Sequence, residues 1–182
     1  MNNKIDMPVI KRILEGDSRA FEEIVSVYGK KVFALVSKMV DRREDAEDIS
    51  QEVFIRVFKS IGMFREDAGF STWIYRIAYN TAVSELRKRK ILFIPIEDET
   101  AESDTEGNGD AEAETESKLC FLDRALKKLP PDERFLITLY YMEDRTMDEI
   151  SAVSGLSPGN VKVKMYRIRK KLEKEINKLM CL

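Results

Sequence analysis

The chain has 182 residues, 43% hydrophobic and 35% charged, which is enough apolar material for one ordinary core or two small ones. It contains no histidine, so histidine-dependent triads, HExxH sites and His-zinc sites are excluded, and no GxGxxG or GxxxxGK(S/T) phosphate loop occurs. No apolar run reaches the roughly eighteen residues of a membrane span and no signal peptide is recognisable, so we expect a cytoplasmic protein.

Charge is unevenly distributed along the chain. The formal net charge is −2, but ten of the 33 acidic residues, and no basic residue, lie between Glu97 and Ser117. The remainder has 31 basic and 23 acidic residues, a balance of +8. A basic body with an acidic insert predicts a polyanionic partner.

The two cysteines, Cys120 and Cys181, lie far apart and belong to no CxxC pair. Neither a disulfide framework nor a zinc site is indicated. We expect reduced thiols, no metal and no cofactor. A carboxylate-only enzyme is not excluded by composition alone.

Three amphipathic helices are predicted before the acidic stretch. Apolar residues recur at helical spacing over 21–39, with Asp17 or Ser18 as the N-cap. A second helix is expected over about 44–61 and a third over about 71–90. The β-prone run ILFIP that follows is interpreted as the end of this domain. The wide apolar face of the second helix comprises Ile49, Val53, Phe54, Val57, Phe58 and Ile61.

The acidic stretch predicts a flexible linker. It has no large apolar residue, includes Gly107 and Gly109, and repels itself, so it cannot repay the entropy of ordering. We therefore predict two helical domains, 1–94 and 118–182, joined by a linker over 95–117.

The second domain contains a predicted helix-turn-helix. After a helix over 131–142, a capping box formed by Thr146 and Glu149 opens a short helix. Gly155 makes a tight turn, and the last helix begins at Ser157. Outside its narrow apolar stripe this helix is mostly basic, with Lys162, Lys164, Arg167, Arg169, Lys170, Lys171, Lys174 and Lys178.

These basic residues predict contact with duplex DNA. Lys and Arg on a recognition helix can contact phosphates and guanine edges. The alternative is a solvated face on a core helix. Eight basic residues against two acidic ones, Glu173 and Glu175, depart from the mixed charge of an ordinary soluble face.

The predicted helix over 71–90 interleaves polar and aromatic residues. On a helical wheel a polar row lies opposite the apolar side, and Trp73 lies at its edge. Amide and guanidinium groups can read bases or hold backbone, and aromatic rings can stack on unpaired bases. Tyr75 and Tyr79 are interpreted as core residues instead. The polar row comprises Arg76, Asn80, Ser84 and Arg87.

A third surface, on the second helix, is acidic and would repel DNA. A protein contact is one interpretation, and simple stabilisation of the helix dipole is the other. The surface comprises Glu44, Asp45, Asp48 and Glu52, with Gln51 nearby.

Together, the segments DAEDISQEVFIRVFKSI, FSTWIYRIAYNTAVSELRKRK and LPPDERFLITLYYMEDRTMDEISAVSGLSPGNVKVKMYRIRKKL resemble extracytoplasmic-function (ECF) sigma factors of bacterial RNA polymerase. The resemblance covers nearly the whole chain apart from the acidic stretch. It implies an all-α, non-enzymatic transcription initiation factor, with sigma region two in the first domain and region four in the second. The implied partners are core RNA polymerase and promoter DNA.

In that family the DAED-QE helix docks on a coiled coil of the largest polymerase subunit. The adjoining segment melts and reads the minus-10 element, and a loop before the reading helix captures a flipped base. The polymerase contacts implied here are Asp45, Asp48, Gln51 and Glu52. The implied minus-10 contacts are Phe64, Phe70, Ser71, Trp73, Arg76, Asn80, Ser84 and Arg87.

Region four of the family reads the minus-35 element with the second helix of its helix-turn-helix. The family pattern is similar to GTVKSR, whereas this chain has GNVKVK, so Asn160, Val163 and Lys164 depart from it. These departures put the base readout in doubt more than the phosphate contacts. The implied minus-35 contacts are Ser157, Asn160, Lys162, Lys164, Tyr166, Arg167 and Arg169.

The linker corresponds to the family segment that threads toward the polymerase active centre. Its acidity either mimics nucleic acid there or makes a passive tether that discourages DNA binding without polymerase. We also expect an anti-sigma factor acting in trans, as is frequent in the family.

An ordinary helix-turn-helix repressor would leave the acidic and aromatic-polar helices unexplained. A protein-binding adaptor would not explain the +8 body.

Overall fold

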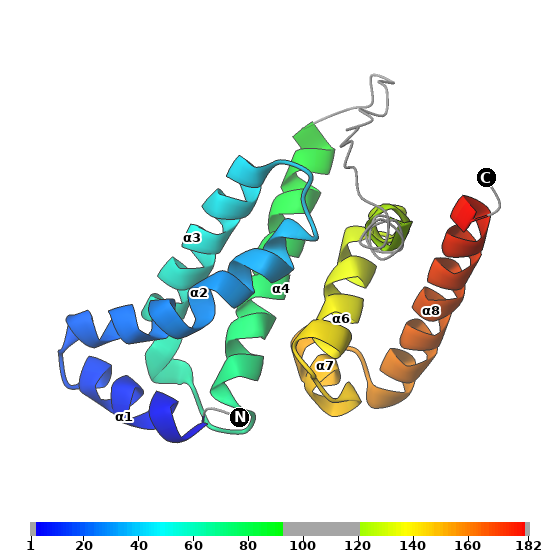
Figure 1. Ribbon diagram of the computed structural model, residues 1–182. Coiled ribbons are helices and arrows are strands. Elements are labelled where there is room, and N and C mark those ends of the chain that lie inside the picture. The colour runs from blue at the N-terminus through cyan, green and yellow to red at the C-terminus, as the bar shows by residue number, and fades with distance from the viewer. Residues whose placement is uncertain (1–2, 93–120, 181–182) are drawn as a thin grey trace, which may run out of the picture.

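The computed structural model describes residues 3–92 and 121–180, and every regular element in these ranges is helical (Figure 1). None of the described helices is long and apolar enough to cross a membrane. The N-terminal half contains α1 (Asn3–Leu14), α2 (Phe21–Ser37), α3 (Arg43–Ser60) and α4 (Phe70–Leu92). The C-terminal half contains a helical segment over 121–127, α6 (Pro131–Met142), α7 (Met147–Ser154) and α8 (Pro158–Met180).

The three helices predicted in the N-terminal half are present as α2, α3 and α4. Asp17 acts as a cap, as predicted, but it caps a short 3-10 turn, Ser18–Ala20, that leads into α2. Its carboxylate accepts a hydrogen bond from the backbone nitrogen of Ala20 at 3.3 Å. The sequence did not predict α1, whose buried residues Val9 and Ile10 pack into the same core.

The core of the N-terminal half forms where the apolar faces of α2, α3 and α4 meet. Val32 and Val53 are fully buried, as are Ile74 and Ala78 on α4. Full burial of a branched aliphatic side chain contributes about 1.5–3 kcal/mol relative to leaving it in water. These contacts fix the direction of α4 and therefore which of its sides faces outward.

The C-terminal half has the predicted helix-turn-helix. Thr146 and Glu149 form the capping box at the start of α7, each side chain bonding the backbone nitrogen of the other. The helix ends at Gly155, whose φ of 72° is left-handed and favours glycine. On α8, Val161 and Ile168 are fully buried, as the apolar stripe predicted.

The two halves pack directly against each other, which the sequence did not predict. Helices α6 and α7 lie along α4 and α2, and the buried residues of both halves form one apolar cluster (Figure 1). The centroids of the Tyr79 and Phe135 rings are 5.3 Å apart across this contact. The predicted linker over 95–117 and both cysteines, Cys120 and Cys181, lie outside the described residues.

A buried carboxyl group in the N-terminal half gives a pH-dependent prediction. Asp6 is 4% exposed and accepts a hydrogen bond from the Tyr28 hydroxyl at 2.9 Å. Burial raises the pKa of Asp6 above its ordinary 3.8, and the Tyr28 hydrogen bond offsets this only in part. Because the folded state favours the protonated acid, this contribution to stability is present at low pH and is lost as pH rises through the folded pKa.

We therefore expect Asp6→Asn, which keeps the shape and an acceptor for Tyr28, to gain stability relative to the native chain as pH rises above about 3.8. Urea unfolding at a series of pH values measures this difference. Parallel stability curves for the two proteins would contradict the prediction.

Candidate nucleic-acid and protein interfaces

The predicted acidic surface lies on the outer side of α3. Asp48 and Gln51 are exposed, and Glu52 is half-buried. Glu52 accepts a hydrogen bond from Arg56 at 2.7 Å, and this bond holds the pKa of Glu52 below its usual value. Glu44 and Asp45 lie in the first turn of α3, where the helix dipole favours acids, but Asp48 and Glu52 lie beyond it. The helix dipole alone therefore does not account for the row, although the Glu52–Arg56 pair within α3 also stabilises the helix.

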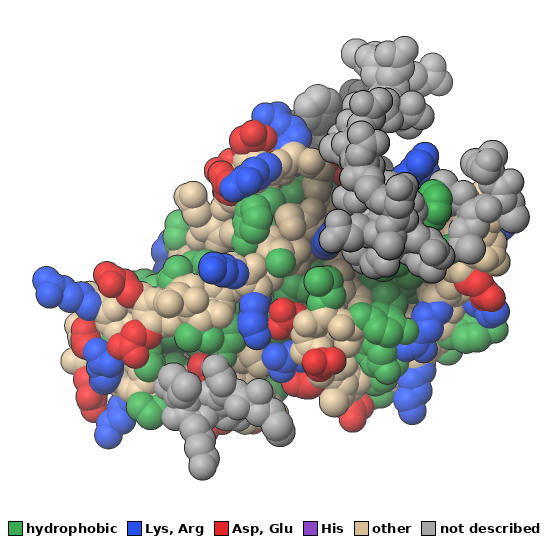
Figure 2. Space-filling model, viewed as in Figure 1, with side chains coloured by type: hydrophobic (Ala, Val, Ile, Leu, Met, Phe, Trp, Pro, Cys, Tyr) green, Lys and Arg blue, Asp and Glu red, His purple; other side chains and the backbone are tan. Residues whose placement is uncertain are grey.

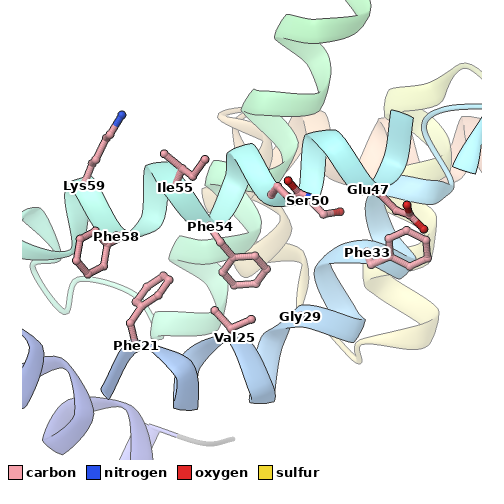
Figure 3. Close-up of a pocket in the computed structure, with 11 residues that line it drawn as sticks. Phe21, Val25, Gly29, Phe33, Glu47, Ser50, Phe54, Ile55, Phe58 and Lys59 are labelled. Atoms are coloured by element: carbon pink, nitrogen blue, oxygen red, sulfur yellow. The ribbon is translucent and has the colours of Figure 1, made fainter. Parts of the chain in front are cut away.

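An open apolar groove lies beside this acidic row, between α2 and α3. Figure 3 shows Phe54 and Phe58 pointing from α3 toward Phe21 and Val25 on α2. The Phe21 and Phe58 rings meet edge to face, with centroids 5.1 Å apart. Gln51 lines the same groove, so the acidic row and the groove form one surface.

The sequence missed this groove. It placed Phe58 on the wide apolar face of the second helix, and the structure shows that this side chain is 43% exposed and that neighbouring Ile55 is 47% exposed. One sequence feature could have indicated the groove. The apolar face of the second helix is wider than a single packing partner covers. We call the groove together with Asp45, Asp48, Gln51 and Glu52 the α3 surface.

The loop over 64–69 and the start of α4 bring three aromatic rings together. The Phe70 and Trp73 rings stack with centroids 5.5 Å apart, and Phe64 meets Phe70 edge to face at 5.1 Å. Phe70 is only 1% exposed, so its ring supports Trp73 and is not available at the surface in this arrangement. Phe64, Trp73 and Arg76 line a small pocket at this loop, and Ala152 of α7 forms part of its wall.

The polar row predicted on α4 is largely accessible. Arg76, Asn80 and Arg87 are exposed, whereas Ser84 is half-buried, as is Ser71 at the start of the helix. Among the described residues, neither Arg76 nor Asn80 has a hydrogen-bond or ion-pair partner. Their donors are therefore available to a ligand.

Tyr75 and Tyr79 are covered, as predicted, but the second half of the chain supplies the cover. Tyr75 is fully buried, and its hydroxyl donates to Glu143 at 2.7 Å. Tyr79 packs against Phe135 of α6. Neither ring is positioned to stack on a base in this arrangement.

The basic residues predicted on α8 divide into two groups. Figure 2 shows Lys and Arg side chains along α8 at the right of the view. Lys164 is held by Asp132 at 2.6 Å. Arg169 donates to the Tyr141 hydroxyl at 3.1 Å and lies over the Tyr140 ring at 5.1 Å. These two side chains have partners within the protein that the sequence did not reveal.

The remaining predicted contacts on α8 are more open. Asn160, Lys162, Tyr166 and Arg167 are exposed. Lys162 and Arg167 have no ion-pair partner among the described residues. Ser157 accepts a hydrogen bond from the backbone nitrogen of Asn160 at 3.4 Å, a geometry that caps the start of α8.

Together, the described residues present an acidic and apolar surface on α3, a polar row beside an aromatic loop on α4, and a basic recognition helix. No cluster of potential metal ligands occurs among them. The arrangement can bind protein and nucleic acid at separate surfaces.

Comparisons with known proteins match both halves of the chain. The family described as Sigma-70 region 2 matches residues 24–91, and the family described as Sigma-70, region 4 matches residues 122–172. The chain is 32% identical to the RNA polymerase sigma-H factor of Pseudomonas aeruginosa, covering 96% of this chain and 95% of that protein. It is 33% identical to the ECF RNA polymerase sigma factor SigW of Bacillus subtilis, covering 93% and 96%.

Solved structures support the fold. The structure of CnrH in complex with the cytosolic domain of CnrY matches with a TM-score of 0.68 and 23% identity, covering 94% of this chain and 97% of that one. The sigma factor RpoE of Bartonella quintana, in complex with the anti-sigma factor NepR, matches with a TM-score of 0.66 and 20% identity, covering 86% and 96%.

The capping box yields a prediction for the helix-turn-helix. Thr146→Ala removes the acceptor for the Glu149 backbone nitrogen and should lower the free energy of unfolding by about 1 kcal/mol. Thr146→Ser retains the hydroxyl and is the matched control. Urea unfolding followed by circular dichroism measures both, and equal losses for the two variants would show that the cap is not the cause.

Proposed function

The chain belongs to the ECF sigma factors of bacterial RNA polymerase, and on that premise we propose that it binds core polymerase and directs promoter-specific transcription initiation. The observation that carries this proposal is the α3 surface beside the polar row of α4. A repressor that binds duplex DNA needs neither an acidic docking surface nor an aromatic loop.

The α3 surface is the proposed polymerase contact. It comprises the predicted residues Asp45, Asp48, Gln51 and Glu52, and its groove adds exposed Ile55 and Phe58. Apolar anchors that lose water on binding supply most of the affinity of protein interfaces, whereas charges at the rim steer association and orientation. The groove therefore adds a source of binding energy to the acids that the sequence indicated.

The loop over 64–69 and α4 form the proposed minus-10 surface. Extruding a base costs a few kcal/mol of unstacking, which a pocket and a stacking ring must offset. The pocket lined by Phe64 and Trp73, with the Phe70 ring packed against Trp73, supports this proposal. The polar row then contacts the adjoining strand through Arg76, Asn80, Ser84 and Arg87.

The start of α8 forms the proposed minus-35 surface. Within 3–92 and 121–180, no acidic group pairs with Lys162 or Arg167, so their charges can meet phosphate or guanine, and Asn160 and Tyr166 are exposed on the same helix. Lys164 and Arg169 instead brace α8 against α6 through Asp132 and the two tyrosines. Ser157 caps the helix and is available to a phosphate at the same end.

The remaining parts of the proposal concern organisation and regulation. Residues 1–94 form the region-two domain and 118–182 the region-four domain, with 95–117 as the linker. The protein acts in the cytoplasm, catalyses no reaction itself and uses no cofactor. An anti-sigma factor regulates it in trans, as the complex of Bartonella quintana RpoE with NepR illustrates for a protein of the same fold.

Transcription with purified core polymerase tests the function. We expect promoter-specific run-off transcripts that disappear when the chain is omitted. Asp48→Lys should weaken core binding by at least tenfold, because it reverses a charge on the α3 surface. Glu22→Lys is the control, since Glu22 is an exposed acid on α2 outside that surface. A wild-type chain that directs no specific transcript from genomic templates would rule out the proposal.

The two groups of basic residues on α8 give a separate prediction for promoter binding by the polymerase complex. Lys162→Ala removes a free charge and should lower affinity across sequences, with a shallower salt dependence by roughly one unit of slope. Lys164→Ala should change the salt slope less, because Asp132 already neutralises Lys164. DNA-binding titrations at several salt concentrations compare the two variants. Identical salt slopes would contradict the distinction between free and paired basic residues.

A further inference from the structure

An exposed valine occupies the outermost position on the first turns of α8. Val163 is 49% exposed, whereas Val161, Met165 and Ile168 on the same helix are fully buried. At about 100° per residue, Val163 lies almost directly opposite the centre of that buried stripe. A recognition helix in the major groove contacts base edges with residues near its N-terminus. Val163 is therefore placed to meet base edges when α8 binds duplex DNA.

The local requirements of a helix do not favour a valine at this position. Branched side chains are restricted in helices, and Lys or Arg forms a helix more readily. In the described part of α8, Val163 is the only aliphatic side chain that is exposed. It is also one of the positions at which the chain departs from the family pattern. Single exposed apolar residues are common on proteins, however, so the surroundings of Val163 decide whether it has a role.

Val163 lines a pocket that combines apolar and polar side chains. Leu156, in the turn before α8, lines the same pocket and packs on the core, which holds it in place. Asn160 and Arg167, about one turn before and one turn after Val163, also line the pocket. Their side chains have no hydrogen-bond or ion-pair partner among the described residues. The pocket therefore offers an apolar contact between an amide and a guanidinium that are both available.

The two other residues that line the pocket are already paired within the protein. Glu133 accepts a hydrogen bond from Lys171 at 2.8 Å, and Lys164 pairs with Asp132 at 2.6 Å. The two positive and two negative charges cancel on this side of the pocket. A phosphate would gain little there, so the pocket suits an uncharged group better than the DNA backbone.

The major groove displays one apolar group, the 5-methyl group of thymine. Every other base edge in that groove presents hydrogen-bond donors or acceptors, which a valine cannot satisfy. A methyl group placed against Val163 and Leu156 loses its contact with water, which favours binding without requiring a directional bond.

We propose that Val163 reads the 5-methyl group of a thymine in the duplex DNA that α8 contacts, with Leu156 as the second apolar contact. This inference rests on the proposed minus-35 role of α8 and names a base that it recognises. Asn160 and Arg167 contact the DNA on either side of that thymine.

Deoxyuridine tests the proposal, because it lacks only the 5-methyl group and keeps every hydrogen-bonding group of thymine. Duplexes that bind the complete chain at low salt are selected from a randomised pool, and each thymine of the selected sequence is replaced in turn. We expect one replacement to weaken binding by the native chain about three- to fivefold, the effect of removing one buried methyl group.

Val163→Ser shortens the side chain and removes both of its methyl groups. The deoxyuridine replacement should then leave the affinity almost unchanged, a result that a merely structural role for Val163 would not produce. Val27→Ser is the matched control, because Val27 is a 36% exposed valine on α2 outside the three proposed surfaces. This control should keep the full three- to fivefold effect. Circular dichroism compares the helical content of both variants with that of the native chain.

Three results would overturn the proposal. The first is a selection that enriches no sequence containing thymine, and the second is a native chain that binds deoxyuridine and thymidine duplexes equally at every position. These two results need no variant. The third is a sensitive thymine whose replacement weakens binding by Val163→Ser as much as binding by the native chain.

The proposed function fails in a different way. If the chain and core polymerase yield no promoter-specific transcript, the function is refuted, but the deoxyuridine comparison on the selected duplexes still shows whether Val163 contacts a thymine methyl group. If transcription occurs and no thymine depends on Val163, only the assignment of this base contact is refuted.

Discussion

The packing of α4 is the constraint on which the rest of the structure depends. Ile74 and Ala78 on one side of this helix enter the core made with α2 and α3. Tyr75 and Tyr79 on a second side are covered by α6 and α7. Because two sides are buried against different partners, the third is left to carry Arg76 and the polar row.

On α8 too, contacts within the protein decide which side chains remain available to a ligand. Here the side chains are charged. A helix rich in Lys and Arg would repel itself and bind polyanions with little selectivity. Asp132 neutralises one of these charges, and the tyrosines of α6 hold another in a cation-π contact. Lys171 also pairs with Glu133 of α6 at 2.8 Å. Lys162 and Arg167 have no ion-pair partner among the described residues, so they carry the charge of the proposed DNA surface.

The three proposed binding surfaces would act cooperatively, because they belong to one chain. If the helix-turn-helix and the proposed single-strand surface each bind DNA weakly, joining them in one chain raises the effective concentration of the second once the first is engaged. Polymerase contact through α3 would then set the spacing.

The sequence by itself determined the helices, the capping box at Thr146, the turn at Gly155 and the charge of each surface. These features depend on neighbours within a few residues, and helical periodicity records which side of each helix is apolar. Only the tertiary structure decided what covers each side. Tyr75 meets Glu143, and Lys164 meets Asp132, across separations that no local pattern encodes. The exposure of Phe58 in the groove was likewise not predictable from local pattern. A helix face can be apolar without having a packing partner within the chain.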